Sequence, residues 1–159
     1  SDAAYREVTG ASLDGVLACL QDYRRLGIWL EITTLVIPGH NDSEQELRQL
    51  AAFIVDELGQ DVPWHLSAFC PTYKMLDRPP TPVATLSMAR EIGQQAGLNY
   101  IYLGNVSDPD AGNTICPGCR RVVVRRQRLQ FVDTDLTRNR CNACGYEIPG
   151  VALSKKELS

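Results

Sequence analysis

The sequence lacks several features that would point directly to a function. It has no run of about eighteen apolar residues, so no segment is expected to span a membrane. The chain does not open with a basic stretch followed by an apolar one, so we expect no secretory signal. No Ser-His-Asp set, paired carboxylates or phosphate-binding glycine loop is recognisable, and no catalytic residue can be named from such motifs. The formal net charge of -3 does not indicate a polyanionic partner.

Cysteines are present but are not spread as in a disulfide framework. Four of the six form two C-x-x-C pairs near the C-terminus, while Cys19 and Cys70 stand alone. The rest of the chain predicts an ordinary α/β core that needs no disulfides, so we expect a reduced, cytoplasmic setting. The first residue is Ser1 rather than Met, and we expect a processed chain or a piece of a longer one.

Helical and strand patterns alternate along the first two thirds of the chain. Apolar periodicity and end signals predict helices over 12–26, 43–58 and 82–96, with Ser43-x-x-Glu46 as a capping box and Thr81 as the N-cap of the third helix. β-branched and apolar runs predict strands over 28–37, 64–69 and 98–103, the first of them buried on both faces. This alternation predicts a parallel sheet with helical crossovers.

Three parallel strands are few for an independent sheet, because its edges would stay open and its apolar faces uncovered. We therefore expect α/β architecture in the form of a partial parallel (βα) barrel half, over residues 1–105, that belongs to a larger barrel or sheet. Residues 106–115 have the composition of a linker, a second unit is expected over 116–150, and 151–159 form a tail.

The second unit contains a strong metal-binding pattern. Cys116-x-x-Cys119 and Cys141-x-x-Cys144 are separated by 21 residues, and a two-residue gap lets a tight turn direct both thiolates at one ion. Gly118 and Gly145 are expected to supply backbone freedom, and strands over 121–125 and 129–132 complete a zinc ribbon. Zinc in this closed four-cysteine site is structural, because no coordination position stays open for a substrate. Two disulfides, an iron site with the same ligands and a redox dithiol are the alternatives.

The ribbon is basic, with seven arginines and two aspartates between Cys116 and Tyr146. A stand-alone zinc ribbon that binds nucleic acid or a protein partner is therefore an alternative function. Aromatic residues do not alternate with the arginines, so nucleic-acid binding is the less favoured reading. Solvated arginines, or arginines that dock on the acidic larger domain, are the favoured explanation of the pattern.

In parallel α/β folds, ligands bind where the strands end. Here the segments 38–42, 70–74 and 104–105 follow strands and carry polar side chains. Asn41, Asp42 and Ser43 are equally explained as helix caps, and His40 as an ordinary loop residue. Cys70 has a candidate ligand-contacting position, whereas Cys19 is expected to be a packing residue and His65 a hydrogen-bonded core or lumen residue.

Four segments together carry a family resemblance: Ile32–Asp42, Trp64–Met75, Tyr102–Val106 and Asn113–Pro117. They resemble the radical SAM enzyme of the AmmeMemoRadiSam system, which is similar to pyruvate formate-lyase activating enzymes. The resemblance implies a partial (βα) barrel with a 4Fe-4S cluster and S-adenosylmethionine at its mouth. The implied chemistry is reductive cleavage of S-adenosylmethionine to a 5′-deoxyadenosyl radical.

The sequence departs from this family at one decisive point, because it contains no C-x-x-x-C-x-x-C cluster motif. The resemblance therefore implies the C-terminal part of such an enzyme, inactive alone and completed by a missing N-terminal barrel half, with a protein as a further candidate substrate or partner. It places the strand-end residues Thr33, Leu35, Ser67 and Cys70 near the bound nucleoside, although related enzymes carry His at the position of Cys70. It makes Tyr73, Lys74 and Asn105 candidates for lining the mouth.

Overall fold

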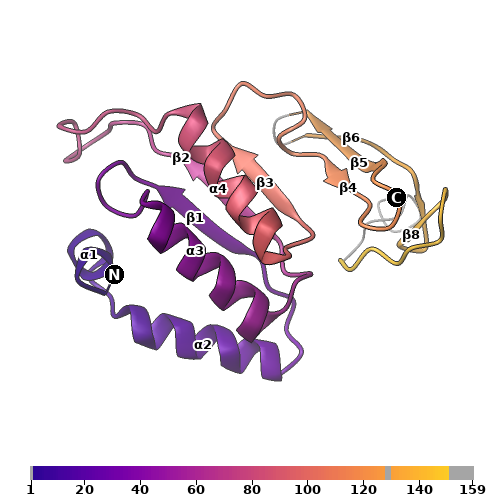
Figure 1. The fold of residues 1–159 in the computed structure, drawn as a ribbon, viewed down its shortest axis with the longest axis horizontal. Helices are drawn as coiled ribbons and strands as arrows, with labels where there is room; N and C mark the ends of the chain where they lie inside the picture. Colours follow the sequence, from indigo (N-terminus) through magenta and orange to yellow (C-terminus); the bar gives the residue numbers. More distant parts are fainter. Residues whose placement is uncertain (1, 128–129, 151–159) are drawn as a thin grey trace. The chain divides into compact units, whose positions relative to one another are not determined.

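The chain divides into two compact units in a computed structural model that describes residues 2–127 and 130–150 (Figure 1). The first, Ser1–Asn105, is the sheet unit, and the second, Val106–Ser159, is the cysteine unit. The tail predicted over 151–159 lies outside the described residues. None of the helices in the described ranges is both long and apolar enough to cross a bilayer.

The sheet unit alternates helices and strands, as the sequence predicts. Its elements in chain order are α1 (Asp2–Thr9), α2 (Leu13–Arg25), β1 (Ile32–Val36), α3 (Glu44–Phe53), the π-helical turn η1 (Ile54–Leu58), β2 (Trp64–Ala68), α4 (Val83–Ala96) and β3 (Ile101–Gly104). The strands are parallel in the order β1-β2-β3, which confirms the predicted parallel sheet. The short helix α1 has no counterpart in the prediction.

One face of the sheet carries the core. Helix α4 packs on β2 and β3, α3 packs beside α4, and Figure 1 shows both helices on the same side of the strands. Trp64 and Leu66 point to this side and are fully buried. A Cβ added at Gly93 of α4 would lie 2.7 Å from Cδ1 of Ile101 and 3.0 Å from the Trp64 ring, so the helix approaches the sheet too closely for a larger residue.

The other face of the sheet is not covered by a helix of the described residues. Side chains alternate along β1, so Thr33 and Leu35 point away from the helices, and Leu35 remains 43% exposed. The prediction of a strand over 28–37 buried on both faces is therefore wrong. Pairing begins only at Ile32, whose N–H donates to the carbonyl of Pro63 at 2.9 Å. An apolar run in the sequence does not indicate which of its residues form hydrogen bonds with a neighbouring strand.

The turn after β1 is held by its own polar side chains. Oδ1 of Asn41 accepts the Ile37 N–H at 2.7 Å, and its Nδ2 donates to the Leu35 carbonyl at 2.9 Å. Oδ1 of Asp42 accepts the Gly39 N–H at 2.9 Å. Ser43 caps α3 by accepting the Glu46 N–H at 3.3 Å, as the capping box predicts. The three polar residues thus have a structural explanation in the turn and the cap.

Thr81 has a role that the sequence pattern does not predict. The N-cap of α4 is Pro82 rather than Thr81, so the helix begins one residue later than expected, at Val83. The buried Oγ1 of Thr81 accepts the Phe69 N–H at 2.8 Å and donates to the Val36 carbonyl at 2.5 Å. Thr81 therefore links the chain just beyond β2 to the last residue of β1.

The cysteine unit is antiparallel. Its strands are β4 (Thr114–Ile115), β5 (Val122–Gln127), β6 (Gln130–Thr134), β7 (Leu136–Thr137) and β8 (Arg140–Cys141). The first three form one sheet in the order β4-β5-β6, and β7 pairs with β8. The expected strands 121–125 and 129–132 correspond to β5 and β6, except that residue 129 lies outside the described residues.

The linker expected over 106–115 falls within the cysteine unit, and its last residues form part of the small sheet. Thr114 and Ile115 form β4, and the buried Asn113 accepts the Arg126 N–H at 2.9 Å through Oδ1. The Arg126 guanidinium donates to Gly112 O at 3.0 Å and to Thr114 Oγ1 at 2.9 Å. Polar and glycine-rich composition resembles that of a linker, but here the polar groups satisfy the edge of a small sheet.

Candidate metal centre

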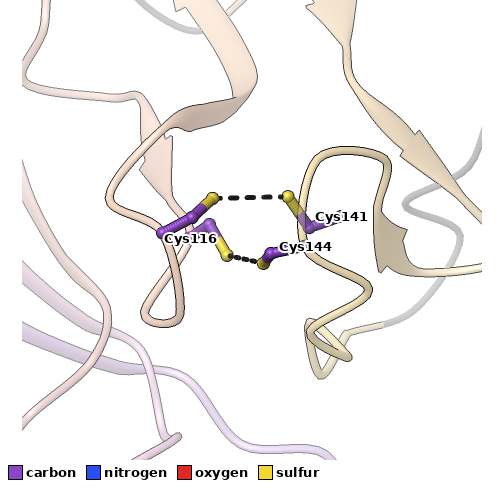
Figure 2. A group of neighbouring side chains, drawn as sticks. Cys116, Cys141 and Cys144 are labelled. Carbon is purple, nitrogen blue, oxygen red and sulfur yellow. Dashed lines mark hydrogen bonds between the residues drawn. The ribbon is translucent and has the colours of Figure 1, made fainter.

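The four cysteines of the two C-x-x-C pairs come together in the cysteine unit. Cys116–Cys119 forms a first knuckle and Cys141–Cys144 a second, and Figure 2 shows sulfurs of the two knuckles facing one another. All four Sγ atoms lie within 4.8 Å of one another, with Cys116–Cys144 at 3.6 Å and Cys119–Cys141 at 3.7 Å. Four sulfurs at roughly 2.3 Å around a tetrahedral ion would be about 3.8 Å apart.

These distances exclude disulfides between the knuckles, because a covalent S–S bond is about 2.05 Å long. All six cysteines are free thiols in the structure. A donor set of four thiolates is the preferred set for zinc and for iron, so the residues fit such an ion. The arrangement is a four-cysteine site able to hold a metal ion such as zinc.

The two knuckles have the same backbone. In the first, the Arg120 N–H donates to Cys116 O at 2.8 Å, and the Cys116 N–H donates to Arg121 O at 2.8 Å. In the second, the Gly145 N–H donates to Cys141 O at 2.8 Å, and the Cys141 N–H donates to Tyr146 O at 2.9 Å. Each knuckle is therefore a closed turn that projects two sulfurs to the same side.

The residue after each knuckle has a left-handed backbone conformation, with φ of +64° at Arg120 and +74° at Gly145. Gly145 thus has the conformational role expected of it, whereas Gly118 does not, since its φ is not positive. Gly118 permits a close approach instead: a Cβ there would lie 3.1 Å from Cδ2 of Tyr146 and 3.3 Å from Sγ of Cys144. Sequence reasoning missed Arg120, although aligning the two C-x-x-C-x segments places it opposite Gly145.

Backbone N–H groups act on the sulfurs of the second knuckle. Burial raises the pKa of the Cys141 thiol, but the N–H groups of Ala143 and Cys144 outweigh it and lower that pKa to about 7. At Cys144 the Tyr146 N–H lowers the pKa, but desolvation and the neighbouring sulfurs together raise it to about 12. Four thiols this close do not all ionise without a cation, because the four thiolates would repel one another. A bound metal ion would offset that repulsion.

The residues expected near a cofactor lie on the uncovered face of the sheet and at its carboxyl end. Leu35 and Ser67 are directly paired in register, and Thr33 pairs with His65 one step earlier along the same face. Gly104 is paired with Ser67, and a Cβ at Gly104 would lie only 2.7 Å from the Ser67 Oγ. Thr33, Leu35 and Ser67 are therefore neighbours on one surface.

The other four candidates follow the strands in loops. Cys70 is exposed two residues beyond the end of β2. Tyr73 is 81% exposed with a φ of +53°, and Nζ of Lys74 lies 5.4 Å from the centre of its ring. Asn105, with a φ of +59°, donates from Nδ2 to the Ala68 carbonyl at 3.0 Å, which ties the end of β3 to the end of β2. Asn105 thus has a structural contact in addition to its predicted position.

A polar cluster at the opposite, amino end of the uncovered face was only partly predicted. His65 lies within a strand as expected, and its Nε2 is 2.7 Å from Oε2 of Glu31. The ring of Tyr102 stacks on the His65 ring, with 5.0 Å between the ring centres. Nε1 of Trp29 donates a hydrogen bond to Oε1 of Glu31 at 3.0 Å. Sequence reasoning missed Glu31 as the partner, because strand register alone brings it to His65.

Fold and site together define a mixed α/β chain with a three-stranded parallel sheet and a C-terminal four-cysteine metal-binding unit. No protein family model matches this chain. The chain is 40% identical over 146 residues to the uncharacterized protein MJ0808 of Methanocaldococcus jannaschii. The alignment covers 91% of this chain but 44% of that protein, so the chain spans less than half the length of this relative.

Proposed function

We propose that this chain is the C-terminal portion of a radical SAM enzyme similar to pyruvate formate-lyase activating enzymes. In this proposal the sheet unit is half of a partial (βα) barrel, and the cysteine unit is a structural zinc ribbon. The observation that carries the proposal is the sheet with helices on one face only, whose other face carries Thr33, Leu35 and Ser67, which are expected near the nucleoside. The length of the relative supports it, because most of that protein lies outside the alignment.

Surfaces beside β1 support the idea of a sheet that continues. Among the described residues β1 and β3 each pair on one side only. Helix α2 carries the apolar stripe Leu13, Val16, Leu17 and Leu20, yet none of its residues is buried. A parallel sheet is normally covered on both faces, so further strands and helices would bury this stripe and close the sheet.

The proposal assigns roles to this chain's own residues. Thr33, Leu35 and Ser67 would line the inner face near the nucleoside of S-adenosylmethionine, with Cys70 beyond them. Tyr73, Lys74 and Asn105 would border the mouth. The 4Fe-4S cluster supplies the electron that cleaves S-adenosylmethionine when it is bound. Its three cysteine ligands are absent from this sequence, so the chain alone is expected to be inactive and to require the missing barrel half.

Zinc is the ion proposed for the four-cysteine site. The two knuckles supply all four ligands, so the ion would have no open position for a substrate and would act in folding alone. Free thiols throughout the chain fit a reduced, cytoplasmic compartment. Metal analysis of protein purified without added metal should find one zinc per chain. Iron with thiolate absorption in the visible range would instead identify a rubredoxin-type or iron–sulfur site.

The function is tested by extending the chain upstream. The full-length protein, reconstituted with iron and sulfide under reducing conditions, should form a 4Fe-4S cluster and convert S-adenosylmethionine to 5′-deoxyadenosine. The chain studied on its own serves as the control and should produce none. If the upstream coding region lacks C-x-x-x-C-x-x-C, or if the full-length protein neither builds a cluster nor cleaves S-adenosylmethionine, the proposal is refuted.

The incomplete barrel is tested separately. The isolated chain should bind an environment-sensitive apolar dye and self-associate, because α2 and the uncovered sheet face leave apolar side chains in solvent. The full-length protein should lose most of this dye binding. A monodisperse monomer that binds no dye would contradict the half-barrel interpretation while leaving the metal site unaffected.

A further inference from the structure

The two knuckles share one backbone but are supported in different ways. The first contains Pro117, whose fixed φ restricts the turn, and Gly118, which packs against Tyr146. The second contains Asn142 and Ala143 between its cysteines, and neither residue restricts the backbone in this manner. A turn without such restrictions needs support from outside to keep two sulfurs aimed at one ion.

That support comes from Asp135, in the short connection between β6 and β7. Oδ1 of Asp135 accepts a hydrogen bond from Nδ2 of Asn142 at 2.9 Å, and its carbonyl accepts the Asn142 N–H at 3.2 Å. One residue thus holds both the side chain and the backbone of Asn142. Because Asn142 directly follows Cys141, this two-point contact constrains the orientation of the second knuckle.

Asp135 is itself anchored to the central strand of the unit. Its N–H donates to the Val123 carbonyl at 2.8 Å, and the buried Thr134 donates from Oγ1 to the same carbonyl at 2.9 Å. Val123 lies in β5, which is hydrogen-bonded to both β4 and β6. The second knuckle is therefore connected through Asp135 to the most constrained strand of the unit.

We propose that Asp135 is a positioning residue for the metal, which preorganises the second knuckle so that Cys141 and Cys144 converge with the first. This inference rests on the metal site of the proposed function and is independent of the radical chemistry. Simple electrostatics would disfavour a carboxylate near a site that carries four thiolates. The hydrogen bond to Asn142, rather than the charge, is therefore the contribution that Asp135 makes.

The experiment compares Asp135→Ala, Asp135→Asn, Asn142→Ala and the double alanine variant, all in the whole chain. Zinc affinity is measured by competition with a chromophoric chelator. Cobalt substitution reports the geometry, because the ligand-field and thiolate charge-transfer bands respond to the positions of the sulfurs. Asp133→Ala is the matched control, since it removes an equal charge from an exposed residue two positions earlier and outside the knuckles.

Asp135→Ala and Asn142→Ala should each weaken zinc binding by about 10- to 100-fold and change the cobalt spectrum. The double variant should be no weaker than the worse single variant, because both remove the same contact. Asp135→Asn keeps an acceptor oxygen and should retain affinity within about threefold, as should Asp133→Ala.

Several outcomes would overturn this inference. These are an unchanged affinity of Asp135→Ala, an equal loss in Asp133→Ala, or a failure of Asp135→Asn to restore binding. Additive losses in the double variant would likewise show that the two residues act separately. If the unsubstituted chain binds no metal, it is the proposed zinc site that fails, so the two failures are distinguishable.

Discussion

The two units of this chain obtain their stability from different sources. The sheet unit buries large side chains such as Trp64, Leu47 and Leu66 between its strands and two helices. Among the described residues of the cysteine unit, the largest fully buried side chains are those of Ile148, Val123, Val124 and two cysteines. The charges differ as well, since Ser1–Asn105 has 13 acidic and 7 basic residues and Val106–Ser159 has 6 and 9. A small sheet with so few large apolar residues depends on cross-links, and the four-cysteine site could supply one by holding a metal ion. We therefore expect the two units to respond independently to perturbation.

The largest expected effect comes from removing the metal. Cys141→Ser, or excess chelator, should unfold the cysteine unit, because binding of a structural zinc contributes about 10–16 kcal/mol to folding. The sheet unit should keep its helical circular dichroism and its tryptophan fluorescence, since both tryptophans lie in it. Cys70→Ser, which changes an exposed cysteine of the sheet unit, is the control. Unchanged metal content in Cys141→Ser would contradict the four-cysteine site.

The reverse perturbation acts on the sheet unit. Trp64→Ala removes a fully buried ring beneath α4 and should lower the free energy of unfolding by about 3–5 kcal/mol. Trp29→Ala, at a side chain that is 40% exposed, should cost about 1 kcal/mol or less. Chemical denaturation followed by circular dichroism gives both values. Metal release at the same denaturant concentration in the variant and the parent would confirm that the units unfold separately, and a parallel shift would argue that they are coupled.

A smaller effect is expected at the link between β1 and the end of β2. Thr81→Val keeps the shape of the side chain but leaves the Phe69 N–H and the Val36 carbonyl without their hydrogen-bond partner. The expected loss is about 2–4 kcal/mol, because each of the two groups is taken at about 1–2 kcal/mol, the lower part of the range for a buried unpaired group. Thr33→Val, the same change on the uncovered face, should alter stability by only a few tenths of a kcal/mol. Equal losses in the two variants would exclude the bridging role.

The smallest effects distinguish the two knuckles. Gly145→Ala places a Cβ at a φ of +74° and should cost about 1–2 kcal/mol, although no other atom is near. Arg120→Gly relieves the same conformation in the first knuckle and should stabilise the unit by a few tenths of a kcal/mol after the entropy of glycine is counted. Thermal unfolding of the zinc-loaded protein measures both. If both substitutions shifted the unfolding temperature in the same direction, the backbones of the two knuckles would not be equivalent in energy.

The order of the elements could be predicted because it depends on local signals. Periodicity located α3 and α4, the capping box located the start of α3 at Ser43, and the spacing of the cysteines located the metal site. These features need only neighbouring residues. The starts and ends of strands were less accurate, since β1 begins at Ile32 rather than at residue 28.

The remaining features depend on register and on distant partners. Nothing near Thr81 indicates that its hydroxyl reaches Val36, and nothing near His65 indicates Glu31. The same holds for Asp135, which contacts Asn142 only because β6 and the second knuckle converge. Whether a sheet face is covered is also not local, so the burial of β1 on both faces could not be judged from its composition.

The unequal exposure of the four sulfurs has a consequence for how the ion would leave. Cys116 and Cys141 are buried, whereas Cys144 faces solvent. A competing thiol, an oxidant or an alkylating reagent would meet Cys144 first, so dissociation should begin with its sulfur and end with the buried sulfurs of Cys116 and Cys141. The lifetime of the bound ion would then be set by how rarely the Cys144 sulfur releases it.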